Sequence, residues 1–470
     1  MPELRYPQIR DPISPVSRTS TTTRLSYASS DIACQLVFAP ISFYLLKFYT
    51  DVYGLAAGVA GTIMLVARFI DAADAPLWGI LFERTRSRWG KIRPWFLWLC
   101  GPFALFGILT FVTPDLEGNA KILYAAGTYI IVNILYTGIN TPVTAILAVL
   151  TQNPQERVVL TCFRMFGSKL GVLLVNLTAM KLVGWLGEGD DRRGYLLTVP
   201  IYCAVAVGLF LLAFRNLKEV VPVETKPQPM LSGFGALRGN WPWWIIAGSS
   251  LLFWIAFIAR VAAAPYFFEY TLGRADLIPL AFALDFISLG TVLGLPWLCR
   301  TFSKSTVWAA GLAGLIVGQL IMGWGLAHGN SLPIIMAGWA LGFLASGAAM
   351  AMPFSILSDS VDYGEWKTGI RAAGLLAAIG AAFCLKAGAG LGGALPGWIL
   401  ESCGYVPHVA QTATVLRGIE FSVVWLPSIA FAAALVPVLF YGKYERQEPK
   451  IHAELAARRG GQVEFKGGTR

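Results

Sequence analysis

The sequence predicts an all-α membrane protein with twelve transmembrane helices. The chain has 470 residues, of which 56% are hydrophobic and only 14% are charged. Soluble domains carry about 25% charged residues, so most of the surface is expected to face lipid. Apolar runs of bilayer-spanning length, roughly 17–25 residues, recur twelve times, centred near residues 40, 69, 104, 135, 170, 204, 254, 287, 316, 345, 385 and 430.

The longest polar interval between spans divides them six and six. It has the sequence NLKEVVPVETKPQPMLSGFGALRGN and three prolines. Basic loops also recur at matching places, ERTRSRWGKIRP after span 2 and CRTFSKS after span 8. Two parallel six-helix repeats with a binding site between them form a transporter architecture. We therefore expect an N-terminal tail, a first half, a linker, a second half and a C-terminal tail, at residues 1–24, 25–215, 216–240, 241–442 and 443–470.

The net charge of +10 follows the predicted topology. Lys and Arg concentrate in both tails and in the loops after even-numbered spans. The opposite loops hold only five: Lys121, Arg192, Arg193, Arg274 and Arg417. This is the positive-inside pattern. It predicts a multi-pass protein of the bacterial inner membrane with both termini cytoplasmic, and it gives no reason to expect a nucleic-acid partner.

Several ionisable residues lie within the predicted spans, where each costs at least about 2.5–3.5 kcal/mol and is expected to pair or to line an aqueous path. Lys47 and Lys181 are near span ends, so we expect them to extend toward the membrane surface. The deeper residues are Arg68, Asp71, Asp74, Arg164, Lys169, Arg260, Asp285 and Lys386.

Asp71 and Asp74 are three residues apart and share one helix face, with Arg68 one turn earlier. One interpretation is structural: Arg68 neutralises Asp71, and Asp74 bonds a neighbouring helix. The other is functional: the two carboxylates supply the hard oxygen ligands that H⁺ or Na⁺ requires. Spacing and composition leave both open.

Long ordered matches relate the chain to a known family. The block LVARFIDAADAPLWGILFERTRSRWGKIRPW, the segments LSY and FYTDVYGL, the loop DSVDYGEWKTGIR and the segment CGYVPHVAQTATVLRGIEF carry the resemblance from about residue 22 to 455. The chain resembles the glycoside–pentoside–hexuronide:cation symporters of the major facilitator superfamily. The resemblance implies the major facilitator fold and cation-coupled sugar transport.

The resemblance also implies two sites. The family's cation ligands correspond to Asp71, Asp74, Ala75 and Thr137, so Asp71 and Asp74 are the candidate Na⁺ or H⁺ ligands. Compared with the family's melibiose permease, the second carboxylate has moved from position 75 to position 74. This turns it about 100° around the helix.

The sugar site is altered further. Tyr136, Arg164 and Lys386 match the family, whereas Gln35 and Asn140 replace aspartates, and Thr144 and Met350 replace tryptophans. Without partner carboxylates, Arg164 and Lys386 would need an anion, and they suit a carboxylate or sulfonate. Alternatively, Asp71 and Asp74 neutralise these two cations, which leaves a pocket for neutral sugars.

The remaining charges are interpreted as ion pairs. Arg260 and Asp285 lie on consecutive spans and are expected to pair. Lys169 is an alternative partner of Asp285. A second alternative is that Asp285 carries a proton. The loop after span 10, with Asp359, Asp362 and Glu365, is expected to close a cytoplasmic gate against the basic loop after span 2.

The sequence thus predicts a monomeric symporter, without a cofactor, that imports a glycoside, hexuronide or other acidic sugar by alternating access, coupled to H⁺ or Na⁺. The same fold could instead carry a lysophospholipid-like amphipathic anion. A membrane enzyme or receptor is disfavoured because the spans contain no HExxH motif and no Ser-Lys or Ser-His constellation, and the chain has no soluble sensor domain.

Overall fold

The structure is a computed structural model. It describes residues 19–151, 154–219, 239–369 and 383–467, together with Leu237, Leu376 and Gly380. Within these residues the chain forms only helices, turns and loops. The predicted linker lies mostly outside the described residues.

The first half of the chain contains six crossings. They are α1 (Thr21–Lys47) with its π-helical extension η1 (Phe48–Val52), α2 (Ala57–Arg84), α3 (Pro94–Leu109), α4 (Gly118–Leu150), α5 (Pro154–Gly187) and α6 (Asp191–Asn216).

The second half repeats this number. Its crossings are α7 (Trp241–Tyr266) with η3 (Phe267–Thr271); the interrupted helix of η4 (Ala275–Leu277), α8 (Ile278–Ala283), η5 (Leu284–Ile287) and α9 (Ser288–Thr301); α10 (Lys304–Ala327); α11 (Leu332–Thr368); α13 (Cys384–Ser402); and α14 (Ala413–Glu420) with η7 (Phe421–Trp425) and α15 (Leu426–Gly467). The predicted twelve helices are therefore confirmed.

Length and apolar composition alone identify nine of these crossings among the described residues. The other three are α2, α3 and α13. Helix α2 carries Arg68, Asp71 and Asp74 within its length, and α3 has only 16 residues. Charged side chains within α2 thus weaken its hydropathy signal.

Polar side chains fix where several helices begin. The side chains of Ser20, Asp190, Asn240, Ser303 and Thr412 each accept a hydrogen bond from a backbone N–H in the first turn of the following helix. Such caps satisfy backbone donors that have no partner inside the helix. The loops therefore stop the apolar runs at defined residues.

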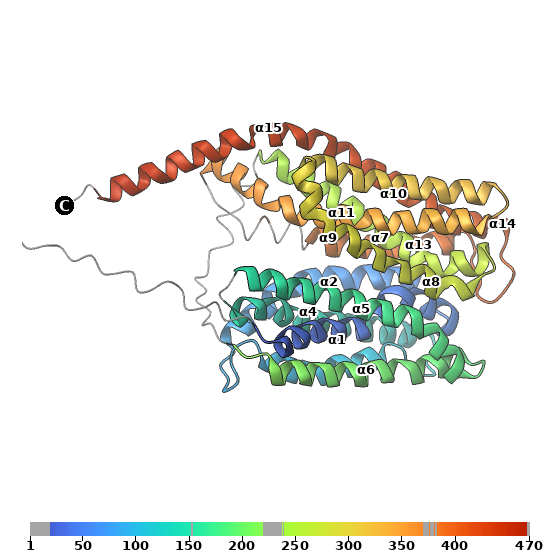
Figure 1. Cartoon of the computed structure of the whole chain (residues 1–470). Coiled ribbons are helices and arrows are strands. Elements are labelled where there is room, and N and C mark those ends of the chain that lie inside the picture. Colours follow the sequence, from blue (N-terminus) through green and yellow to red (C-terminus); the bar gives the residue numbers. More distant parts are fainter. Residues whose placement is uncertain are drawn as a thin grey trace, which may run out of the picture.

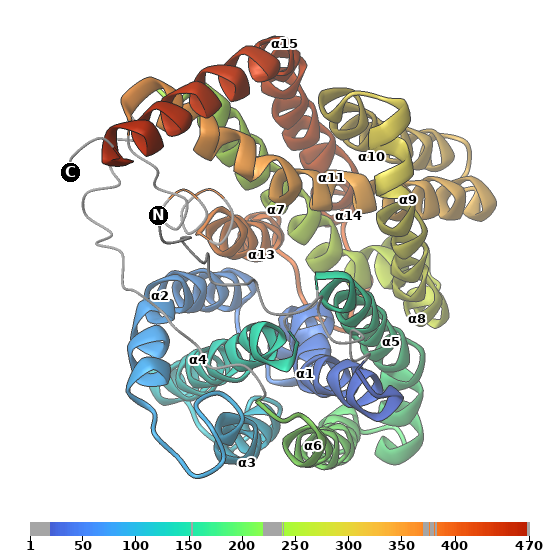
Figure 2. The same ribbon diagram turned by 60° about the vertical axis from the view of Figure 1, so that its left-hand side comes forward.

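The helices form two bodies, α1–α6 and α7–α15, that lie side by side (Figures 1 and 2). Helix α2 packs on α13, and α5 packs on α8, across the boundary between the halves. Small residues bring α2 and α13 very close. A Cβ atom added to Gly61 would lie 2.7 Å from the carbonyl oxygen of Ala394, and one added to Gly397 would lie 2.4 Å from that of Ala57. Small residues commonly allow such backbone approach in membranes.

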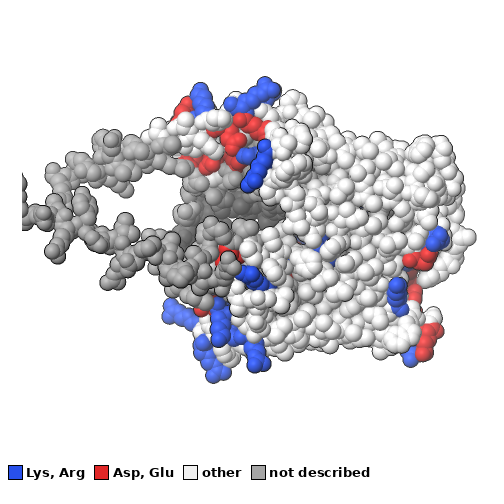
Figure 3. Space-filling model, viewed as in Figure 1, with Lys and Arg blue, Asp and Glu red and all other residues white. Residues whose placement is uncertain are grey.

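The described chain begins and ends at the same end of the bundle, which we call the terminus end; the other is the opposite end (Figure 1). In Figure 3, charged side chains gather at both ends and leave a largely uncharged band between them. Helix α15 extends beyond the bundle at this end and remains helical to Gly467.

Candidate functional site

The predicted cation residues meet near the boundary between the halves. Asp71 and Asp74 on α2 and Thr137 on α4 are all buried, at 2%, 6% and 9% exposure. Thr137 Oγ1 donates a short hydrogen bond to Asp71 Oδ1. Lys386 on α13, in the other half, approaches this group: its Nζ lies 3.1 Å from Asp71 Oδ1, 3.4 Å from Thr137 Oγ1 and 3.7 Å from Asp74 Oδ1. It also bonds the backbone carbonyl of Asp71.

The two carboxylates differ in their partners. Asp71 accepts hydrogen bonds from Thr137 and Lys386, and Arg68 Nη1 lies 3.7 Å from its Oδ2. Both carboxylate oxygens of Asp74 are buried without a hydrogen-bond partner among the described residues, and Lys386 Nζ lies 3.7 Å from its Oδ1. A buried carboxylate oxygen without a donor is costly, so Asp74 is poised to accept a proton or another cation.

The oxygen donors fit a small cation. Carboxylate, hydroxyl and backbone carbonyl oxygens converge on one positively charged nitrogen, the Lys386 ammonium, which stands where a cation would bind. Na⁺ needs several such oxygens, so it would have to displace Lys386 from them. A proton needs one oxygen and could bind Asp74 without this displacement. The side chain of Ala75 lies outside the described residues.

The expectation that Arg164 and Lys386 lack partner carboxylates is wrong. Arg164 Nε lies 2.6 Å from Asp31 Oδ2, and Lys386 pairs with Asp71 and Asp74. Asp31 is buried in α1, at 4% exposure. It lies four residues before Gln35 and therefore on the same helix face, which is the signal that could have identified it in the sequence.

The other predicted solute residues lie on α1 and α4. Gln35 Nε2 donates to Ser168 Oγ on α5 at 3.0 Å. The Tyr136 ring stacks on Phe38, with ring centroids 3.8 Å apart, and the Arg68 guanidinium lies over the same Phe38. Asn140 is half-buried one turn after Tyr136. This set places amide and aromatic groups beside two charge pairs, Arg164–Asp31 and Lys386–Asp71.

The expected Arg260–Asp285 pair is replaced by the alternative pair. Asp285 Oδ2 lies 2.7 Å from Lys169 Nζ on α5, in the other half. Arg260 is fully buried and bonds the backbone carbonyl of Trp339 at 2.9 Å, with its guanidinium stacked over the Trp339 ring. The spacing of charges along single helices could not decide between these partners.

The opposite end is closed by polar contacts that the sequence analysis missed. Lys47 does not extend to the membrane surface; it pairs with Asp51 and with Glu269 of the other half. Tyr405 donates to Asp51 at 2.8 Å, and Thr50 bonds Tyr266 at 2.8 Å. The spacing of four between Lys47 and Asp51 is the signal for a helical ion pair.

At the terminus end, the predicted gate residues engage their own half. Asp359 pairs with Lys304 at 2.9 Å, and Asp362 lies 3.6 Å from His452. Glu365 accepts the capping bond of Gly369 through its carbonyl. In the first half, Glu219 accepts backbone N–H bonds from the loop after span 2. The expected contact between this loop and the loop after span 10 stays a prediction.

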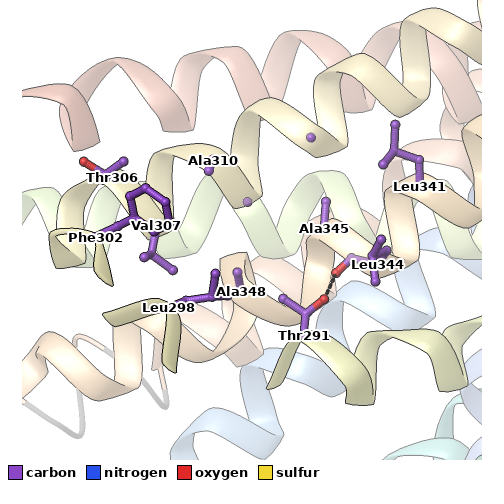
Figure 4. A pocket seen from close by; sticks show the side chains of 12 residues that line it. Thr291, Leu298, Phe302, Thr306, Val307, Ala310, Leu341, Leu344, Ala345 and Ala348 are labelled. Carbon is purple, nitrogen blue, oxygen red and sulfur yellow. Dashed lines mark hydrogen bonds between the residues drawn. The ribbon is translucent and has the colours of Figure 1, made fainter. Parts of the chain in front are cut away.

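An apolar cleft of about 350 Å³ lies between α9, α10 and α11 (Figure 4). Its lining is mostly small and aliphatic, including Ala310, Leu341 and Ala345. Its Thr291 already donates to the Leu344 carbonyl at 2.7 Å. The cleft therefore offers no polar group suited to holding a sugar, in contrast to the charged boundary between the halves.

Comparisons with known proteins agree with this architecture. A family model described as MFS/sugar transport protein matches residues 26–443. The isoprimeverose transporter of Lactiplantibacillus pentosus is 40% identical over 436 residues, covering 92% of this chain and 90% of its own. The inner membrane symporter YicJ of Escherichia coli is 31% identical, covering 93% and 95%. A crystal structure of a D-xylose–proton symporter superposes with a TM-score of 0.61 at 17% identity, covering 90% and 97%, and supports the fold alone.

The fold and the charged inter-half site define a membrane transporter of the major facilitator superfamily, not an enzyme. Within it, the chain belongs to the sugar transporters of the glycoside–pentoside–hexuronide:cation symporter family.

Proposed function

We propose that this protein imports a sugar or glycoside by alternating access, coupled to a cation that binds at Asp71 and Asp74. One observation carries the proposal: oxygens of α2 and α4 converge on a cationic atom supplied by α13, across the boundary between the halves. A site shared by both halves can sense their relative position. A ligand that binds one arrangement better shifts the equilibrium toward it.

The coupling cation acts through Lys386. When Lys386 is bound to Asp71, the two halves are linked at the cation site. A cation that takes over the carboxylates weakens this link and favours rearrangement. The cation and the solute thereby influence each other's affinity, as linkage requires. We propose H⁺ as the coupling ion, because Asp74 already presents buried oxygens without a hydrogen-bond donor among the described residues.

The charges around the solute residues favour a neutral sugar. Arg68, Arg164 and Lys386 are matched by Asp31, Asp71 and Asp74. The preference for an acidic sugar depended on unpaired cations, and this premise no longer holds. Gln35, Asn140 and Tyr136 supply the hydrogen-bonding and aromatic groups that sugar hydroxyls and ring faces require.

The predicted orientation assigns the two ends to the two sides of the membrane. Basic residues gather at the terminus end (Figure 3), so we place this end in the cytoplasm of a bacterial inner membrane. The opposite end, which contacts between the halves close, then faces outward. The described arrangement corresponds to the inward-facing state of a transporter that functions as a monomer.

Asp71→Asn tests the coupling. The variant should lose uphill solute accumulation in energised cells while keeping solute exchange across vesicles, because exchange needs no net cation movement. Asp276→Asn is the matched control, since Asp276 is exposed and pairs only with Arg274. Uphill accumulation by a folded Asp71→Asn protein would remove the coupling role. If Na⁺ strongly stimulates uptake by the native protein and acid pH does not, the coupling ion is Na⁺ and not H⁺.

Asp31→Asn tests the solute assignment. In the native protein, a neutral glucoside should compete for uptake at least as well as its matched glucuronide. Asp31→Asn leaves Arg164 without its carboxylate and should improve the glucuronide relative to the glucoside by about tenfold, the value of one charge-assisted bond. If the native protein prefers the glucuronide, the proposal that the charges of the solute site are balanced is wrong. If the ratio of glucuronide to glucoside inhibition is unchanged in Asp31→Asn, Arg164 does not belong to the solute site.

A further inference from the structure

A poorly satisfied charge lies away from the proposed sites. Arg260 on α7 is fully buried, and its Nε and Nη1 have no hydrogen-bond partner among the described residues. Its Nη2 donates to the Trp339 carbonyl. A buried guanidinium with unused donors is costly. We therefore ask whether the unused donors of Arg260 bind an acceptor in another conformation of the protein.

The surroundings of Arg260 are built around the guanidinium. It stacks 4.0 Å over the Trp339 ring and 5.1 Å from the Phe343 ring. Gly342 leaves the space for it, since an added Cβ would lie 2.5 Å from Nη1. The stacking holds the planar group in place while two of its nitrogens remain available for an acceptor.

A candidate acceptor is Asp285. Trp339 links the two regions, because its Nε1 donates to the Ala281 carbonyl, one turn before Asp285, while its own carbonyl binds Arg260. In this structure, however, the Asp285 carboxylate is bound to Lys169 of the other half.

Asp285 sits where the backbone can turn. It belongs to η5, a 3₁₀ segment that interrupts the eighth crossing between α8 and α9. A 3₁₀ stretch within a membrane helix commonly marks a hinge. The Lys169–Asp285 bond lies where α5 packs against α8 and η5, so separating the halves at this place must break it.

We propose that Asp285 exchanges partners during transport: it binds Lys169 in the present arrangement and Arg260 when α5 moves away from the eighth crossing. This inference rests on the proposed alternating access. Arg260 then compensates the Asp285 charge in the outward-facing state, and Lys169 compensates it in the inward-facing state. The exchange keeps a buried carboxylate paired in both states and reduces the difference in free energy between them.

The exchange predicts opposite effects for two charge removals. Lys169→Gln weakens only the present arrangement, so the population open at the opposite end should rise by about tenfold or more. Arg260→Gln removes the partner of Asp285 in the alternative arrangement, whereas the contacts of Arg260 with Trp339 lie within one half, so the same population should fall by a similar factor. Lys181→Gln is the matched control, since Lys181 is an exposed lysine on the same helix α5.

The measurement is the distance between spin labels across the opposite end, in lipid nanodiscs without solute. The labels are attached at Asn119→Cys in the first half and Val409→Cys in the second, both exposed positions. Cys162, Cys299 and Cys403 are replaced to prevent background labelling. Because no solute or Na⁺ is added and the pH is the same for every variant, an error in the coupling or solute assignment would leave the differences between variants unaffected.

A charge exchange completes the test. Lys169→Asp combined with Asp285→Lys restores the pair between the halves but places a lysine next to Arg260 in the alternative arrangement. This double variant should populate the present arrangement alone. The proposal is overturned if Lys169→Gln and Arg260→Gln shift the distances in the same direction, if Arg260→Gln shifts nothing, or if every variant shows one unchanged population.

Discussion

The two ends of the molecule use similar residues in different ways. At the opposite end, Lys47 and Asp51 of the first half bond Glu269 and Tyr405 of the second. At the terminus end, the ion pairs of Arg24 with Glu156 and of Lys304 with Asp359 and Glu448 each lie within one half.

This difference indicates which contacts stabilise the present arrangement of the two halves. Polar contacts that cross between the halves favour one relative position of the halves, whereas contacts within a half stabilise that half in every position. Removing a crossing contact should therefore change the conformational populations. Removing an internal contact should change only stability. The following variants test this distinction.

Asp51→Asn should have the largest effect. The Asp51 carboxylate accepts hydrogen bonds from Lys47 and Thr50 and from Tyr405 of the other half. Removing one charge of a buried pair costs about 3–5 kcal/mol. Much of this cost destabilises the arrangement in which the opposite end is closed. The distance between labels at Asn119→Cys and Val409→Cys should lengthen in most molecules. Asp276→Asn, at an exposed pair of the same end, should leave it unchanged. A short distance retained in Asp51→Asn would show that packing alone closes this end.

Asp359→Asn should have an intermediate effect of another kind. The Asp359 carboxylate binds Lys304 and Tyr441, all within the second half. We expect a loss of about 1–3 kcal/mol in stability, visible as a lower Tm in detergent, without a change in the label distances. If Asp359→Asn instead altered the distances, the terminus-end charges would contribute to the balance between the two states.

Glu156→Gln should have the smallest effect, and it depends on pH. Hydrogen bonds from Thr19 and the nearby Arg24 hold the pKa of Glu156 below its ordinary value of 4.5. A carboxylate with a lowered pKa contributes stability at neutral pH and loses it as the pH falls through the lowered pKa. The native protein should therefore exceed Glu156→Gln by about 1–2 °C in Tm at neutral pH. The difference should shrink as the pH falls below 4.5 and disappear below the lowered pKa; a constant difference would mean that the carboxylate charge is not involved.

The sequence predicted the fold and part of the site. The twelve crossings match the twelve apolar runs counted along the sequence, and the contact of Asp71 with Thr137 matches the residues that the family resemblance brought together. The partners of Arg164 and Asp285 could not be predicted in the same way. Spacing along one helix shows which residues share a face, but the rotation of each helix against its neighbours decides which faces meet.

The close approach of α2 and α13 has a mechanical consequence. Near Gly61, Ala394 and Gly397 the backbones touch without interlocking side chains. Such a smooth contact offers little resistance when one helix tilts on the other, and points near a tilt axis move less than points far from it. Lys386 lies two turns along α13 from Ala394 and can follow Asp71 through a tilt, while the helix ends at the terminus end travel farthest. The seam of small residues would then act as the pivot of the two halves.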